Sequence, residues 1–426
     1  MERLLQYVWK YRLFSTVDLQ TEEGIPVMVI DPGIQNTDAG PDFFNAKISI
    51  SGAVWAGNVE IHRKASDWKN HHHDMDPAYD SVILHVVEEA DAKACRTNGE
   101  KIPQAVIQIP PAIQNNMNWL LSRDTPLPCA ERIHEVEPVY ISTWMNTLLT
   151  ERLERKVNDI FSRLEQNRND WNEVFYITLT RNFGFGNNSD AFEWLARSLP
   201  FRVILKQRCN SLQIESLLFG QAGLLVEELD DPYYQLLQQE YHFLQKKYRL
   251  KPVDYGTIKQ LRMRPLNFPH LRLAQLAAIW THNDTLFSRL LEDNQLDTLK
   301  ACFDVSLSAF WDTHYQFRFP SPAKKKTIGL NATNIILINT VVPILFAYGK
   351  KMQKPDYCAK ALQMLETIPA ERNSLIVNFT EAGIPVKNAS DSQAIIQLRR
   401  EYCEKKKCLY CRIGFRLIKS THHKRG

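Results

Sequence analysis

The order of hydrophobic and polar positions divides the chain into a β-rich N-terminal part and a long helical remainder. Between about residues 25 and 110 the apolar positions fall in short runs bounded by Gly, Pro, Asn and Asp, a pattern typical of strands and turns. The runs cover residues 27–30, 46–50, 54–62, 81–87 and 105–109. Residues 1–14 place apolar side chains at helical spacing and predict a short amphipathic helix.

Beyond residue 124 the apolar positions recur every three or four residues, as on one face of a helix. Residues 142–164 and 271–291 show this pattern. It is clearest over residues 232–248, where one apolar stripe contains Tyr233, Leu236, Leu237, Tyr241 and Leu244. The whole pattern predicts an α+β fold, with a mixed N-terminal sheet and flanking helices followed by a large α-helical region.

Composition fits a globular protein of two or three domains. The chain has 426 residues, of which 44% are hydrophobic and 23% charged, and these values exclude wholesale disorder. Proline and lysine clusters mark breaks near residues 124–128 and 350–354. We therefore expect a β-rich domain over residues 1–125, an α-helical domain over 126–350, and a small helical tail with a basic, cysteine-bearing end over 351–426.

The first residues mix charged and apolar side chains, so we expect no export signal. The longest apolar stretch, residues 335–346, is too short to span a bilayer and contains Asn339, Thr340 and Pro343, so it predicts a buried helix. We expect a cytoplasmic protein without a membrane partner. In that compartment the eight cysteines are reduced thiols or metal ligands rather than disulfides.

The β-rich part contains a group of side chains suited to phosphodiester hydrolysis. Asp42 follows a Gly-Pro turn, and Glu60, His62 and Lys64 share one face of a predicted strand. Asp42 and Glu60 are predicted ligands of Mg²⁺ or Mn²⁺, and His62 or Lys64 would activate or position the attacking water. In the alternative, Asp42 caps a turn and the other three side chains form the solvated face of a half-buried strand.

This pattern resembles the restriction-endonuclease-like superfamily. Its motif is Pro-Asp, a variable gap, and then Asp or Glu, any residue, and Lys; here Pro41-Asp42 matches the first half and Glu60-Ile61-His62 the second. His62 stands where that superfamily has lysine, and histidine differs from lysine in pKa and donor geometry. The resemblance implies a metal-dependent nuclease with a mixed sheet flanked by helices.

A histidine cluster follows directly. Residues 67–76 contain His71, His72 and His73 among several carboxylates, and His85 lies on the next predicted strand. Because neighbouring side chains diverge, at most one or two of the three consecutive histidines can bind one ion; His73 and His85 are the predicted ligands. This favours, as an alternative, a zinc-dependent hydrolase of another class that uses His62, His73 and His85. The structural alternative is a polar loop with Trp68 against the core and His85 hydrogen-bonded in the sheet.

Two segments of the helical region bear on nucleic-acid binding, since the net charge of only +4 does not indicate it. Residues 181–188 form a glycine- and asparagine-rich turn that lacks the lysine of a phosphate-binding P-loop. Residues 261–272 interleave Arg262, Arg264 and Arg272 with aromatic residues and prolines, a surface that can contact phosphates or stack on bases. The alternative is a rigid connection whose arginines pair with internal carboxylates.

The C-terminal segment predicts a second, structural metal site. Cys403, Cys408 and Cys411 follow one another at ligand-like spacing among basic residues, and either zinc or an iron–sulfur cluster suits such thiolates. The spacing leaves the fourth ligand open; the candidates are His422, His423 and a distant cysteine such as Cys129. In the alternative these cysteines are buried like small apolar residues.

Several motifs together resemble an uncharacterised bacterial family known only as a domain of unknown function. The motifs are AGPDF at 39–43, GNVEIH at 57–62, YD at 79–80, HVV at 85–87, LFGQAG at 218–223, RMRPLNFP at 262–269, YC at 402–403 and CLYC at 408–411. The resemblance covers nearly the full chain and implies a bacterial, cytoplasmic protein. It supplies no activity, substrate or catalytic residues.

Three hypotheses therefore stand beside one another. The first is a nuclease that uses Mg²⁺ or Mn²⁺ and contacts DNA or RNA, and the second is the zinc-dependent hydrolase. The third is a non-catalytic binding or assembly protein in which the helical region carries the function. We adopt the nuclease as the interpretation to test, because Asp42 and Glu60 combine the required residue types with flanking strands.

Overall fold

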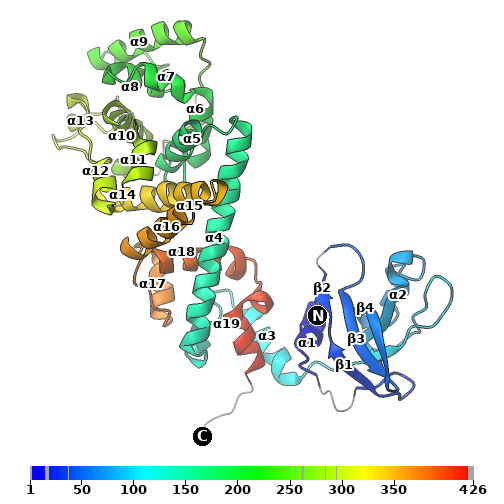
Figure 1. Cartoon of the computed structure of the whole chain (residues 1–426). Helices are drawn as coiled ribbons and strands as arrows, with labels where there is room; N and C mark the ends of the chain where they lie inside the picture. The colour runs from blue at the N-terminus through cyan, green and yellow to red at the C-terminus, as the bar shows by residue number, and fades with distance from the viewer. Residues whose placement is uncertain are drawn as a thin grey trace. The chain divides into compact units, whose positions relative to one another are not determined.

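The computed structural model describes residues 2–14, 19–36, 38–254, 256–260, 263–283, 285–293 and 295–420. It confirms the α+β fold, with a six-stranded mixed sheet in the N-terminal region followed by many helices (Figure 1). The chain forms two compact units, Met1–Trp144 with Arg399–Gly426, and Met145–Leu398. The division differs from the three predicted domains, because residues 351–398 pack within the helical unit and the segment after them within the first unit.

The sheet joins an antiparallel part to a parallel part. Its strands run in the order β1-β3-β4-β5-β6, with β2 paired to β3; β1, β3 and β4 are antiparallel, and β4, β5 and β6 are parallel. The strands are β1 (Val27–Asp31), β2 (Ile34–Gln35), β3 (Phe43–Ile50), β4 (Ala53–Lys64), β5 (Val82–Glu89) and β6 (Gln104–Val106). The last predicted strand, residues 105–109, was too long, since β6 ends at Val106 and a helix begins at Pro111.

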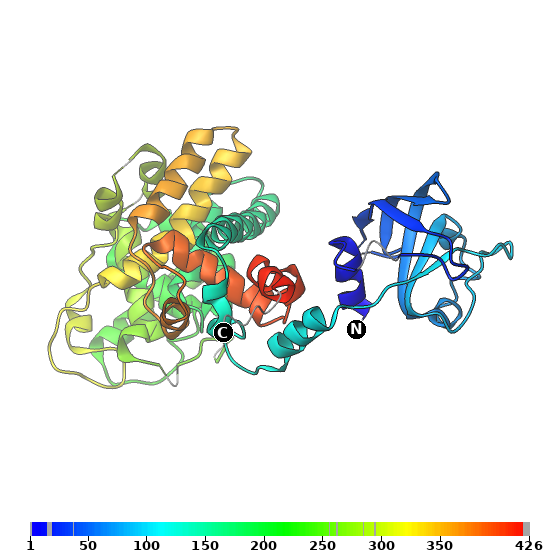
Figure 2. The ribbon, with the colours of Figure 1, turned by 90° about the horizontal axis from the view of Figure 1, so that it is seen from below.

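The two faces of the sheet are covered by different elements. Helix α1 (Glu2–Lys10) lies along one face, where its apolar side packs with Val59 and Ile61 of β4 in the main core of this unit (Figures 1 and 2). This confirms the predicted N-terminal helix. Short helix α2 (Asp67–Asn70) and the η1 turn (Pro77–Tyr79) cover the opposite face, where Trp68 is buried. Because side chains alternate along a strand, Glu60 and His62 point to this second face.

Further helices complete the first unit. They are α3 (Pro111–Ser122), η2 (Ala130–Glu135), η5 (Leu398–Cys403), η6 (Cys408–Tyr410) and α19 (Arg412–Lys419). Buried Leu409 and Ile418 belong to the same hydrophobic core as α1 and the sheet. The C-terminal segment is therefore part of the N-terminal unit, although it is far from it in sequence.

The second unit is helical. Helix α4 (Pro138–Gln166) leads into it, and its other helices are α5 (Trp171–Phe183), α6 (Ser189–Ser198), α7 (Phe201–Lys206), α8 (Ser211–Gln221), α9 (Pro232–Tyr248), η3 (Pro265–Asn267), α10 (Pro269–His282), α11 (Leu286–Glu292), α12 (Leu296–Ala301), α13 (Ala309–Thr313), α14 (Leu330–Ile336), η4 (Leu337–Val341), α15 (Val342–Lys351), α16 (Pro355–Thr367), α17 (Ser374–Glu381) and α18 (Ala389–Gln397). The helices predicted over 142–164 and 232–248 are confirmed. The one predicted over 271–291 is two helices, since α10 ends just before Asn283, whose backbone leaves the helical conformation and whose side chain donates to the carbonyls of Ile279 and Cys302.

One apolar helical stretch runs through the core of this unit. Among the described residues, only Leu330–Lys351 is long and apolar enough to cross a membrane, and 72% of its most apolar window is buried inside the structure. The stretch contains the π-helical turn η4 just before Pro343, where the wider turn accommodates a residue without a backbone N–H. The predicted buried helix over residues 335–346 is thus confirmed.

Candidate metal centre

Backbone N–H groups of two neighbouring strands hold the carboxylates of Asp42 and Glu60 in place. Asp42 immediately precedes β3, whose first residue, Phe43, pairs with Val59 of β4. The backbone N–H of Asp42 donates to Glu60 Oε2 at 2.9 Å, and the backbone N–H of Ile61 donates to Asp42 Oδ2 at 3.1 Å. The antiparallel register therefore brings the two carboxylates together, as the sequence motif predicts. Glu60 is only 5% exposed.

Helix α1 contributes two side chains that the sequence analysis did not single out. Gln6 Nε2 donates to Asp42 Oδ1 at 2.8 Å. Glu2 lies one helical turn earlier, and burial raises its pKa while the nearby His71 lowers it and the charge of Glu60 raises it further. Their only sequence signal is the spacing of four residues, which puts both on one face of a helix.

Burial and the charge of Glu60 raise the pKa of Asp42, and the hydrogen bond from Gln6 opposes that rise. Two carboxylates that share a site with little water cannot both ionise freely. A proton or a bound cation relieves the repulsion between them. The arrangement is therefore suited to a divalent ion.

Three histidines lie beside this carboxylate pair. Candidate ligand atoms of His62, His71 and His73 all lie within 4.8 Å of one another. His62 Nε2 and His73 Nε2 lie 3.5 and 3.4 Å from Glu60 Oε1. Since Glu60 contacts Asp42 through its other oxygen, the carboxylates and imidazoles form one continuous group. Imidazole nitrogen favours transition metals, whereas carboxylate oxygen also suits Mg²⁺.

The turn through the three consecutive histidines explains how two of them reach the same group. His72 has a positive φ of 60° and is exposed. This left-handed residue reverses the chain, so that His71 and His73 come close to His62 while His72 does not join them. The prediction that at most two of the three consecutive histidines serve one site agrees with this geometry.

His85 contacts His62 instead of joining the group of three. His62 Nδ1 lies 2.9 Å from His85 Nε2, and His85 Nδ1 lies 3.2 Å from the Gln104 side-chain amide. Burial lowers the pKa of His62 to about 3 and holds that of His85 well below its usual range. Both rings are therefore neutral, which is the form that binds metals.

Aromatic side chains close this side of the site. The Tyr79 ring stacks on His73 with centroids 3.7 Å apart, and Trp68 packs edge-on against His73 at 5.4 Å. The Trp68 indole N–H donates to the carbonyl of Cys95 at 2.9 Å, which fixes the ring. With further contacts of Trp68 to His62 and His85, these contacts shield His62, His73 and His85 from water, whereas His71 stays exposed. They also confirm that Trp68 is packed against the core.

The predicted catalytic residues divide into two groups. Glu60 and His62 are 5% and 1% exposed, so the alternative of a solvated strand face is wrong for both. Lys64 instead forms an exposed ion pair with Glu89, with 3.0 Å between Nζ and Oε2. The structure thus brings Asp42 together with Glu60 and His62 and places the ammonium of Lys64 at the exposed end of β4.

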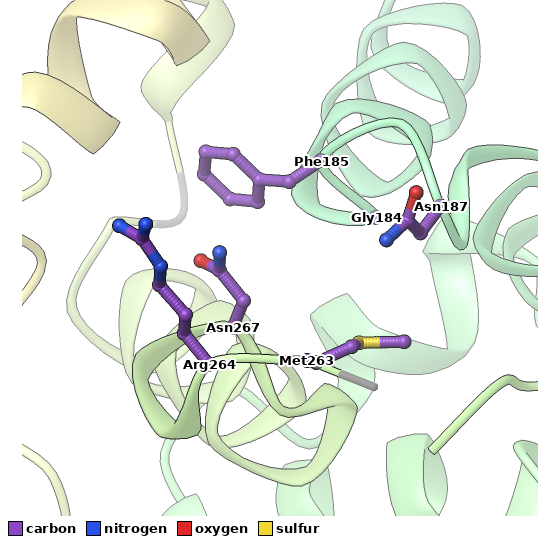
Figure 3. A pocket seen from close by; sticks show the side chains of 6 residues that line it. All are labelled: Gly184, Phe185, Asn187, Met263, Arg264 and Asn267. Carbon is purple, nitrogen blue, oxygen red and sulfur yellow. The ribbon is translucent and has the colours of Figure 1, made fainter. Parts of the chain in front are cut away.

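The two polar segments of the helical unit meet at one cavity of about 270 Å³. Figure 3 shows its lining, Gly184, Phe185, Asn187, Met263, Arg264 and Asn267. Arg272 is not the surface arginine that was predicted, because it is 6% exposed and its guanidinium donates to Gln275 and Asn267. Arg262 lies outside the described residues, so Arg264 is the predicted nucleic-acid contact that lines a cavity.

A family model described as "Protein of unknown function (DUF2851)" matches residues 2–374. The chain belongs to this family. The match includes α1 and all strands of the sheet, and it ends before Cys403. No curated protein and no solved structure matches the chain. The DUF2851 description states no activity, so any function has to be argued from the site itself.

Proposed function

We propose that this DUF2851 protein is a metal-dependent nuclease that hydrolyses phosphodiester bonds in DNA or RNA, with Mn²⁺ or Mg²⁺ held by Asp42 and Glu60. The observation that carries the proposal is a pair of hydrogen bonds across β3 and β4, in which the Asp42 N–H donates to the Glu60 carboxylate and the Ile61 N–H donates to the Asp42 carboxylate. It aligns two carboxylates of neighbouring strands in a setting that disfavours their joint ionisation. Paired carboxylates are the ligands by which nucleases hold divalent ions.

The surrounding side chains supply the remaining requirements of hydrolysis. A divalent ion bound there would polarise a phosphoryl oxygen and lower the pKa of a bound water. His62 occupies the position of the lysine in the restriction-endonuclease-like motif, but its low pKa keeps it neutral. It therefore suits a role as ligand or as hydrogen-bond acceptor for the attacking water, and His73 beside Glu60 favours Mn²⁺ over Mg²⁺.

The test is cleavage of labelled single- and double-stranded DNA and RNA in Mn²⁺ and in Mg²⁺. We expect Glu60→Gln and Asp42→Asn each to lower metal-dependent cleavage by at least about 100-fold, since each removes a charged ligand. Glu89→Gln is the matched control, because Glu89 lies on the neighbouring strand with its carboxylate exposed. Equal cleavage by wild type and Glu60→Gln would exclude this site as the source of the activity.

The group of three histidines favours a second candidate, a zinc-dependent hydrolase of another class. Three imidazoles within 4.8 Å match the ligand set of catalytic zinc better than that of Mg²⁺. This candidate predicts one tightly bound zinc per chain that His62→Ala and His73→Ala both abolish. Stoichiometric zinc without cleavage of any nucleic acid would move the assignment from nuclease to zinc hydrolase.

A further inference from the structure

Tight turns bring the three C-terminal cysteines together. Between Cys403 and Cys408 the chain reverses, with the N–H of Lys406 donating to the carbonyl of Cys403 at 3.1 Å and Lys406 at a positive φ of 49°. The N–H of Cys411 donates to the carbonyl of Cys408 at 3.3 Å. Helix α19 then packs directly on this turn, since a Cβ at Gly414 would lie 2.2 Å from the Cys408 carbonyl oxygen.

Hydrogen bonds from both ends of this segment hold Cys129 beside it. Arg399, before the cysteines, donates to the carbonyl of Pro126. After the cysteines, Arg132 Nη2 donates to Ser420 Oγ at 2.8 Å, and Asn116 donates to the Ser420 carbonyl at 2.9 Å. Cys129 lies between Pro126 and Arg132, at the start of η2. The stretch of chain around Cys129 is therefore hydrogen-bonded to the C-terminal segment on both sides.

The four thiols are free and close enough to influence one another. Burial raises the pKa of each thiol. In every pair of these four cysteines, the charge of one thiol also raises the pKa of the other. The pKa of Cys408, for example, is raised to about 11, by burial first and by Cys411 second. Four thiols on segments that the hydrogen bonds above hold together are the ligand set that zinc and iron–sulfur clusters share.

A buried donor also faces the group. The indole Nε1 of Trp144 has no hydrogen-bond partner by distance and angle within the described chain, and the residue is 4% exposed. It lies near enough to the Cys411 sulfur to lower the pKa of that thiol. The Trp144 ring is held by Tyr402, with centroids 5.1 Å apart, and by the Arg412 guanidinium at 5.3 Å. Such N–H groups stabilise the charge on metal-bound thiolate sulfur.

The separation of the sulfur atoms indicates the kind of metal group. Ligands of one tetrahedral zinc lie about 3.8 Å apart, given a Zn–S distance of about 2.3 Å. Across the described residues, the histidine group is the only one with three or more ligand atoms within 4.8 Å of one another. No three of the four cysteine sulfurs therefore lie within 4.8 Å of one another, a wider spacing than that around one zinc. The Cys-x4-Cys-x2-Cys spacing is also that of the first three ligands of plant-type iron–sulfur proteins, although their fourth cysteine follows the three and Cys129 precedes them.

We propose that Cys129, Cys403, Cys408 and Cys411 bind an iron–sulfur cluster. The cluster cross-links η2 to the C-terminal segment and fixes α19 on the core that also contains α1 and the sheet. Its role is therefore structural with respect to the first unit. The proposed cluster uses neither Asp42 nor Glu60 as a ligand. Its test therefore does not depend on the proposed nuclease activity.

The test is analysis of the full-length protein purified without oxygen. We expect two or four irons per chain with as many acid-labile sulfides, and the broad visible absorption of such clusters. Cys129→Ser should lower the iron content at least about 10-fold, because it removes a ligand 274 positions before Cys403, whereas Cys209→Ser, at an exposed thiol, should leave it unchanged. The Glu60→Gln protein should retain the full cluster.

Three outcomes would overturn the proposal. The first is one zinc per chain without sulfide, which would assign the thiols to a zinc site. The second is iron content that Cys129→Ser leaves at the wild-type level. The third is failure of the wild-type protein to take up iron and sulfide during anaerobic reconstitution, a result that does not depend on the folding of any variant.

Discussion

His85 Nε2 lies 2.9 Å from His62 Nδ1, and both rings are buried. Gln104 Nε2 donates to His85 Nδ1 at 3.2 Å, so the proton of the neutral His85 ring lies on Nε2 and is donated to His62 Nδ1. The proton of His62 then lies on Nε2, which is 3.5 Å from Glu60 Oε1. This chain of hydrogen bonds fixes the His62 ring, and a metal at His62 Nε2 would take the place of that proton. His85 is then a positioning residue rather than a ligand, which differs from the ligand role predicted for it.

Replacing His85 should weaken metal binding without removing a ligand. For His85→Ala we expect a 10- to 100-fold rise in the Kd for Mn²⁺, as is typical when a hydrogen bond behind a metal-binding histidine is lost. Calorimetric titration of the metal-free protein measures it. His72→Ala, at an exposed histidine of the same cluster, should bind Mn²⁺ like the wild type. An unchanged Kd in His85→Ala would show that His62 needs no such support.

Lys64 should be dispensable for cleavage. Its ammonium forms an exposed ion pair with Glu89, and solvent screens such pairs so that they contribute little. We expect Lys64→Gln to retain cleavage within about 5-fold of wild type. His62→Ala, assayed in parallel, should lose most of the activity. A loss in Lys64→Gln as large as that in His62→Ala would return the catalytic role to the lysine.

The helical unit should lose stability in mild acid because of His270. Burial lowers the pKa of this histidine to about 4, while the charge of Glu227 acts in the opposite direction, and the ring packs on Phe317 with centroids 5.3 Å apart. The unfolded chain, with a histidine pKa of about 6.5, binds the proton first, so the free energy of unfolding falls as pH drops from about 6.5 to about 4. The contribution is up to about 3 kcal/mol.

Urea unfolding of wild type and His270→Gln, followed by circular dichroism across this pH range, measures the effect. Because glutamine does not titrate here, the variant should lose less stability on acidification than the wild type. Parallel curves for the two proteins would show that His270 does not control the acid sensitivity.

Gly220 should not tolerate a side chain. A Cβ there would lie 2.1 to 2.4 Å from three ring atoms of Tyr241, where α8 packs against α9. We expect Gly220→Ala to cost about 1–3 kcal/mol, the usual penalty of overpacking. Gly329→Ala is the matched control, since no atom lies within 4 Å of a Cβ there and its φ is −66°. Equal melting temperatures for the two variants would contradict the close packing of α8 on α9.

Local sequence pattern accounts for much of the fold and for half of the candidate site. Alternation along β4 correctly assigned Val59 and Ile61 to the core and Glu60 and His62 to the other face. It failed where a single residue decides the outcome. The backbone of Asn283 leaves the helical conformation and divides a continuous apolar pattern into two helices, and the fixed turn at His72 selects which histidines converge.

By itself, the sequence determined the strands, most of the long helices, and the pairing of Asp42 with Glu60, because neighbouring strands of a meander place nearby residues at predictable positions. Only the tertiary structure decided which distant side chains join them. Gln6 and Glu2 reach the site because α1 packs on β4, and Cys129 reaches Cys403 because the C-terminal segment folds back onto η2. Such contacts form when apolar faces of distant segments pack together. Local spacing shows that a face is apolar but does not show which partner it will meet.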